Sequence, residues 1–214
     1  MEITWYGLSC FRFSERGGIS IVCDPYDHQQ VGFSSLKLKA EVVTISHNAP
    51  GHNHLTAVKG DPYVIQGPGE FEIGGVFITG IRTNGKKRDT DEPYNTLYLF
   101  DFDGLAVVHL GDLSRVPTQT EVEALGQVDV ALVPVGAGGG LNAAKAAEVI
   151  NILDPNIVIP MHYATSETSL KLLPLERFLK EMGVDEVAPL ASLKIDHSHL
   201  PDETHVIVLE ARKS

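Results

Sequence analysis

Closely spaced apolar segments, most of them too short for helices, constrain the fold of this chain more than any other feature. In the first half, Cys10 to Phe13 and Ile19 to Cys23 flank a Gly-Gly turn at 15–18, and Val42 to Ile45 is a β-branched run. Further strands are expected at 2–6, 63–65, 76–81, 96–102 and 105–110. The pattern predicts a first half built mainly from short strands joined by turns.

The second half alternates strands with helices. Segments 118–125 and 143–153 have helical spacing and good helix formers, and Asn142 is the expected N-cap of the second. A third helix is expected within 169–182, with Pro174 delaying its start and Gly183 at its C-cap. Strands are expected at 130–135, 157–159, 193–195 and 205–209. This order predicts an α/β fold in which two sheets pack together and helices cover their outer faces.

Length and charge limit the class of protein. The 214 residues suffice for one sizeable core, so a single domain spanning 1–214 is expected. The formal charge of −11 argues against a nucleic-acid partner, and the basic run 85–88 is followed directly by acidic residues. No apolar run approaches the roughly 18–20 residues that cross a bilayer, and the first residues do not form a signal peptide. We therefore expect a cytoplasmic protein without a membrane partner, in which Cys10 and Cys23 are small buried hydrophobes.

Side chains of the kinds that bind metals follow several of the expected strands. They are His47, His52, Glu70, Asp112 and His162. Strand ends that open onto loops are where α/β folds place ligands, and imidazole and carboxylate groups bind metals such as zinc. Each residue also has an ordinary structural interpretation, because a histidine can be hydrogen-bonded at a strand end and an aspartate can close a turn. Their joint placement predicts one metal pocket.

Taken in order, the motifs around these residues resemble the metallo-β-lactamase superfamily, and most of all its branch of predicted zinc-dependent hydrolases similar to ascorbate-phosphate lactonases. The resemblance covers nearly the whole chain. Its segments are Trp5-Tyr6-Gly7-Leu8-Ser9-Cys10 with Asp24-Pro25, and residues 45–52, 67–70, 109–112, 143–149 and 159–163. It implies a four-layer αββα sandwich of two mixed sheets flanked by helices, with the metal pocket at one edge of the sheets.

The family signature His-x-His-x-Asp-His is incomplete in this chain. It starts at His47 and ends at His52, so that its second histidine falls on Ala49 and its aspartate on Gly51. Neither replacement has a side chain that binds metal. His54, two residues beyond the signature, is not expected to substitute.

The remaining family ligands have counterparts further along the chain. The resemblance places a later histidine at or near Glu70, a bridging aspartate at Asp112 and the last histidine at His162. Two histidines with one carboxylate, such as His52 and His162 with Asp112, still suffice for one zinc ion with an open position. The same set suits manganese or iron. A complete two-metal clamp is not expected.

Two functions compete on these grounds. The first is a weakened, mononuclear metal-dependent hydrolase of a small ester, lactone or phosphate-bearing metabolite, in which Asp112 is also catalytic. The second is a metal-free, non-catalytic relative whose pocket binds a ligand or a protein, because two ligand positions are lost. A third hypothesis is a nuclease. The acidic net charge and the missing metal ligands both argue against it. The sequence leaves open the substrate, the metal and whether the chain forms a homo-oligomer.

Overall fold

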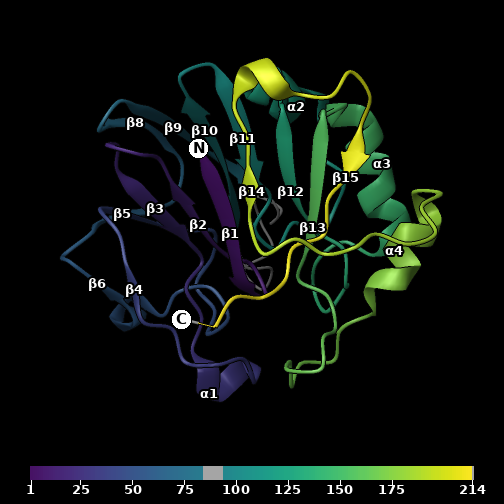
Figure 1. Ribbon diagram of the computed structural model, residues 1–214, viewed down its shortest axis with the longest axis horizontal. Helices are drawn as coiled ribbons and strands as arrows, with labels where there is room; N and C mark the ends of the chain where they lie inside the picture. The colour runs from purple at the N-terminus through teal and green to yellow at the C-terminus, as the bar shows by residue number, and fades with distance from the viewer. Residues whose placement is uncertain (84–93, 214) are drawn as a thin grey trace.

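The computed structural model describes residues 1–83 and 94–213 and contains two mixed β-sheets packed face to face (Figure 1). The first sheet consists of β1 (Glu2–Gly7), β2 (Cys10–Ser14), β3 (Ser20–Cys23), β5 (Val42–Ile45), β7 (Tyr63–Gln66) and β14 (Leu193–Lys194). The second consists of β8 (Gly69–Ile73), β9 (Val76–Thr83), β10 (Asn95–Phe102), β11 (Leu105–His109), β12 (Val130–Pro134), β13 (Ile157–Met161) and β15 (His205–Val206). Their spatial orders are β14-β1-β2-β3-β5-β7 and β15-β13-β12-β11-β10-β9-β8.

The outer faces of the sheets carry unequal layers. The helices are α1 (His28–Val31), α2 (Gln119–Leu125), α3 (Ala143–Leu153) and α4 (Leu175–Glu181), with 3₁₀ turns η1 (Leu55–Ala57) and η2 (His197–His199). In Figure 1, α3 and α4 lie together outside the second sheet, whereas α1 and the strand pair β4 (Leu38–Lys39) and β6 (Val58–Lys59) lie beside the first. The predicted αββα sandwich is confirmed, but its first outer layer is a one-turn helix and a short strand pair.

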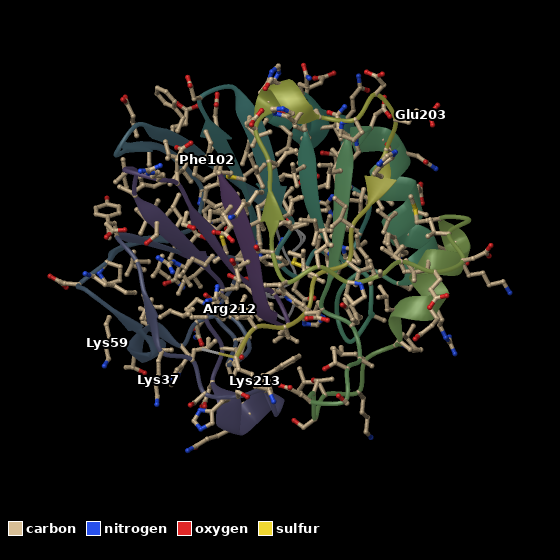
Figure 2. The ribbon with its side chains drawn as sticks, in the orientation of Figure 1. Lys37, Lys59, Phe102, Glu203, Arg212 and Lys213 are labelled. Carbon is tan, nitrogen blue, oxygen red and sulfur yellow. The ribbon has the colours of Figure 1, made fainter. Side chains whose placement is uncertain are left out.

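The facing surfaces of the two sheets form the main core. Phe13 of β2 contacts Phe100 and Phe102 of β10, with ring centroids 5.1 and 5.9 Å apart. Figure 2 shows side chains filling the space between the sheets, whereas Lys37, Lys59 and Glu203 point outwards at the rim. Cys10 and Cys23 are buried and not disulfide-bonded, as predicted. Burial of these apolar groups is the main source of stability, at roughly 25 cal/mol per Å².

The helix expected within 169–182 begins at Leu175, so the predicted delay of its start by Pro174 is confirmed. Pro174 is the N-cap and disfavours helical backbone in the residue before it. β8 was not predicted, although Gly69–Ile73 alternates in exposure as an edge strand should. The basic run 85–88 lies outside the described residues. Among the described residues, no helix has both the length and the apolar character that a membrane span requires.

Strand direction brings several loops to one edge of the sandwich. β3, β5 and β7 are parallel, as are β11, β12 and β13, so each set ends on one side of its sheet. Two backbone hydrogen bonds join the sheets at this edge: His162 N–H donates to Leu8 O at 3.0 Å, and Thr96 N–H donates to Ser46 O at 2.8 Å. The loops after β1, β5, β11 and β13 are therefore held together, as metal ligands from separate loops require.

Candidate metal centre

Three of the predicted ligands meet at this edge. His47 and His52 follow β5, Asp112 follows β11, and each offers one ligand atom within 4.8 Å of the other two. His47 Nε2 lies 4.0 Å from Asp112 Oδ2, and the ring centroids of His47 and His52 are 4.0 Å apart. Groups far apart in the sequence thus form one imidazole and carboxylate cluster.

His162 lies beside this cluster, directly after β13. Its ring is stacked on that of His52, with centroids 5.6 Å apart and an interplanar angle of 26°. The buried Nδ1 atom of His162 has no hydrogen-bond partner among the described residues. Its backbone is left-handed, with φ 55°, and is held by the bond to Leu8 and by Gly136 N–H, which donates to His162 O at 3.1 Å. His162 is therefore fixed next to the cluster as a further nitrogen donor.

Glu70 is the predicted ligand that the structure does not bring to this cluster. It lies on β8, the edge strand of the second sheet, opposite Thr79 of β9. Its side chain is exposed. β8 begins at Gly69, so Glu70 belongs to an edge strand rather than to a loop at the cluster.

Asp24 and Ser46 organise the two signature histidines, although no site role was predicted for either from the sequence. Asp24 is fully buried, and its Oδ2 lies 2.8 Å from His52 Nδ1. Ser46 donates to Asp24 through its N–H at 2.7 Å and through its hydroxyl at 2.6 Å. The same hydroxyl lies 3.1 Å from His47 Nδ1, from which it accepts. Both rings then carry their proton on Nδ1 and present the Nε2 lone pair, the form in which histidine binds a metal.

Burial sets the protonation states of the cluster. Burial lowers the pKa of His47 to about 4, with the neighbouring His52 adding to the effect, and lowers the pKa of His162 to about 3. Burial would raise the pKa of Asp24, but His52 and Ser46 outweigh it and hold this pKa at about 2. Burial raises the pKa of Asp112. Near neutral pH the imidazoles of His47 and His162 are therefore uncharged, and a histidine must be uncharged to bind a metal.

A second set of buried groups positions Asp112. Asn95 Oδ1 accepts from Asp112 N–H at 2.9 Å, and Asn95 Nδ2 donates to Leu110 O at 3.0 Å and to Thr83 Oγ1 at 3.1 Å. His109 Nδ1 accepts from Gly111 N–H at 3.2 Å, so its Nε2–H donates to Ser9 O at 2.9 Å. Gly111 is left-handed, with φ 60°, and a Cβ there would overlap Asn95 and Ser46. These contacts between β10 and the loop after β11 fix the turn that presents Asp112.

A cavity of about 450 Å³ opens beside the cluster. His47, His52, Asp112 and His162 line one part of it, and Lys171 and several apolar side chains line the rest. A larger cavity of about 900 Å³ lies at the other end of β1 around Met1 and contains no residue of the cluster. Of these two cavities, the smaller one gives access to the metal-binding groups.

The position of the missing signature aspartate is filled by the protein itself. Gly51 is buried, and a Cβ at this position would lie 2.7 Å from Leu8 Cδ2. Ala49, at the position of the second histidine, lines the same cavity. Leu8 thus occupies the space beside Gly51 that a longer side chain would need.

This packing predicts that restoring the aspartate alone harms the protein. Gly51→Asp is expected to destabilise the fold by about 1–3 kcal/mol, because the new side chain overpacks against Leu8. Adding Leu8→Ala should recover part of that loss relative to the sum of the two single changes. Urea unfolding of the single and double variants measures this coupling, and strict additivity would show that Leu8 does not close the position.

Two mixed sheets with a histidine and carboxylate pocket at their common edge define the metallo-β-lactamase class of proteins. Residues 2–162 match the family model described as the beta-lactamase superfamily domain. A UPF0173 protein of Pyrococcus furiosus is 31% identical over 189 residues, which cover 77% of this chain and 84% of that protein. The chain therefore belongs to the metallo-β-lactamase superfamily and, within it, to the UPF0173 family.

Other relatives agree with this assignment. A UPF0173 protein of Natranaerobius thermophilus, named a metal-dependent hydrolase, is 24% identical over 192 residues, covering 77% of this chain and 84% of that one. A crystal structure from Thermotoga maritima, of a protein proposed to be a Zn-dependent hydrolase of the superfamily, is 36% identical. It superposes with a TM-score of 0.79 and covers 97% of both chains. Membership of a family of metal-dependent hydrolases implies a metal cofactor.

Proposed function

We propose that this protein is a hydrolase of a small ester, lactone or phosphate-bearing metabolite that works with a single metal ion. Zinc is the first candidate, and manganese and iron suit the same ligand types. The observation that carries the proposal is the convergence of His47, His52 and Asp112 within 4.8 Å. The closed position at Gly51 favours one ion over two.

The donor set fits such an ion. His47 and His52 present Nε2, since Ser46 and Asp24 hold their Nδ1 atoms, and Asp112 supplies a carboxylate oxygen. His162 would add a fourth donor from the adjacent strand end. When bound, the ion supplies Lewis acidity toward the scissile group and activation of water. Asp112 is placed to orient a water molecule and accept its proton, which is the catalytic role proposed for it.

The experiment is a metal-dependent hydrolysis assay with a matched pair of histidine variants. Zinc-, manganese- or iron-loaded protein is offered p-nitrophenyl esters, a γ-lactone and bis-p-nitrophenyl phosphate. His52→Ala is expected to lower turnover by more than about 100-fold, because loss of a ligand costs more than loss of its supporting contact. His54→Ala should stay within about twofold of wild type, because the His54 ring bonds Thr56, outside the cluster. Metal-loaded wild type that hydrolyses none of these compounds would instead favour the non-catalytic binding function.

A further inference from the structure

We propose that the cavity beside the metal centre recognises an uncharged, apolar acyl group, so that the substrate class is a carboxylic ester of such an acid. This inference rests on the proposed hydrolase function and narrows its substrate. It follows from the apolar part of the cavity, the segment that supplies that part, and the distribution of charge around it.

Two chemically different groups of side chains line the cavity. One group is the imidazoles and Asp112, and the other includes Leu8, Val31, Pro50, Leu170 and Leu172. Leu170 and Leu172 are only partly buried. Covering the exposed part of a leucine side chain removes apolar surface from water and is therefore favourable. The volume of about 450 Å³ lies within the range of roughly 300–1,000 Å³ usual for small-molecule sites. Partly exposed leucines facing metal-binding groups are what an apolar substrate group would cover.

A fixed segment, residues 164–173, carries two of these leucines; we call it the strap. At one end, Thr168 Oγ1 and Ser169 N–H both donate to Val31 O, at 3.2 and 2.9 Å. At the other end, Leu173 N–H donates to Gly136 O at 2.8 Å. In Figure 1 the strap is the green loop between β13 and α4, on the same side of the molecule as α1. The apolar wall is therefore held in place without a ligand.

The strap lies beyond residues 2–162, which match the superfamily domain. Leu172 is seated against the loop after β12, where a Cβ at Gly138 would lie 2.5 Å from Leu172 Cδ2. The glycine at this position thus makes room for the leucine. The strap thus adds Leu170 and Leu172 to an apolar lining to which Leu8, Val31 and Pro50 of the superfamily domain also contribute.

The charges of the cavity favour an uncharged group over a phosphate. Of the described residues that line the cavity, Lys171 is the one that carries a positive charge, and it is exposed. Asp112 lines the cavity, and the buried Asp24 lies directly behind His52. The proposed metal ion would attract a phosphoryl oxygen as well as an ester carbonyl, so the ion does not distinguish the two. Away from the ion, a phosphate would meet one solvated ammonium, the Asp24 carboxylate behind His52 and apolar side chains, which is weak recognition for an anion.

The two altered signature positions fit the same substrate. Ala49 and Gly51 replace groups that would be charged or metal-bound with small apolar surface. Gly51 lets Leu8 approach the cavity wall, since a Cβ there would overlap the Leu8 side chain. The change that removes a second metal position therefore also enlarges the apolar side of the cavity.

Trp5 provides a direct readout of occupancy in the unmodified protein. It is the single tryptophan of the chain, is 2% exposed, and its Nε1–H donates to Leu8 O at 3.0 Å. We would titrate the protein with the N-methyl amides of acetic, butanoic and hexanoic acids, which are uncharged and resist hydrolysis. Trp5 fluorescence and calorimetry would follow binding. Affinity is expected to rise about fourfold per added methylene, as complete burial of each group predicts.

Matched variants test whether the dependence of affinity on chain length arises at Leu172 in the cavity. Leu172→Asn should abolish the dependence on chain length, whereas Leu190→Asn, at a leucine 44% exposed and outside the cavity, should retain it. Lys171→Ala should leave amide binding unchanged. Equal affinity for all three amides would overturn the proposal. So would methyl phosphate binding more tightly than the amides and losing affinity in Lys171→Ala.

The amide-binding experiment and the hydrolysis assay can fail independently of each other, so they test the apolar subsite and the hydrolase activity separately. Chain-length-dependent amide binding without hydrolysis of any ester would uphold the apolar subsite and refute the proposed hydrolase activity. Ester hydrolysis with no preference among acetate, butanoate and hexanoate esters would uphold the activity and refute the subsite.

Discussion

Asp24→Ala is expected to destabilise the protein by about 3–5 kcal/mol, because each buried donor left without its charged acceptor costs about 1–3 kcal/mol. The change leaves the Ser46 N–H, the Ser46 hydroxyl and the His52 ring without their common acceptor in a fully buried place. Asp24→Asn keeps the shape but turns an N–H₂ donor toward these groups, and should weaken zinc binding by about 10–100-fold. Urea unfolding and zinc competition titrations measure the two effects.

The control for Asp24 is Asp202→Asn, which changes the same charge at an exposed position far from the cluster. It should alter stability by less than about 0.5 kcal/mol and leave zinc affinity unchanged. Equal zinc affinity in Asp24→Asn and Asp202→Asn would mean that the carboxylate does not set the orientation of His52.

Asn95→Ala is expected to cost about 1–3 kcal/mol, because it removes the side-chain acceptor of the Asp112 N–H and one of two donors to the buried Leu110 carbonyl. The Leu110 carbonyl keeps the Leu113 N–H, at 3.2 Å. It should also weaken zinc binding by about tenfold, since the turn that presents Asp112 loses its clamp. Asn95→Asp retains an acceptor for the Asp112 N–H but not the donor to Leu110. It should therefore recover part of the zinc affinity while remaining less stable than wild type.

Asn156→Ala is the control that distinguishes a general loss of protein stability from a loss of the correct position of Asp112. Asn156 donates to Pro201 O at 2.7 Å in a partly buried contact away from the cluster. Its replacement should lower stability while leaving zinc affinity intact. If Asn95→Ala and Asn156→Ala both lose zinc affinity in proportion to their loss of stability, Asn95 stabilises the fold but does not position Asp112.

Much of the fold could be predicted from the sequence because strand signals are local. The run at Val42–Ile45 and the helix at Ala143–Leu153 with its Asn142 N-cap lie where the pattern places them. β8 was missed because its glutamates made it resemble a loop after Gly67 and Gly69. The start of α4 depended on the local effect of Pro174, which weighed more than the amphipathic pattern before it.

The site was only partly predictable from the sequence. Candidate metal ligands can be recognised by residue type and position, whereas the residues that hydrogen-bond to them cannot. His47, His52 and Asp112 are marked by residue type at strand ends, and they converge. Asp24, Asn95 and His109 support them from strands and strand ends, but each does so through a partner 15 or more residues away in the sequence. Asp24 at the end of a strand before Pro25 offered the one local signal that could have been used. Leu8 and the strap gave no such signal, since their role depends on packing across the sheets.

The most direct test of the single-metal site is the metal content of protein purified without chelator and then offered zinc. Wild type and Glu70→Gln are expected to retain about one zinc per chain, because Glu70 is exposed on β8 away from the cluster. His47→Ala should lose it, and His162→Ala should hold it more weakly or lose it. Two zinc ions per chain in wild type, no zinc in wild type, or loss of zinc from Glu70→Gln would contradict the proposed site.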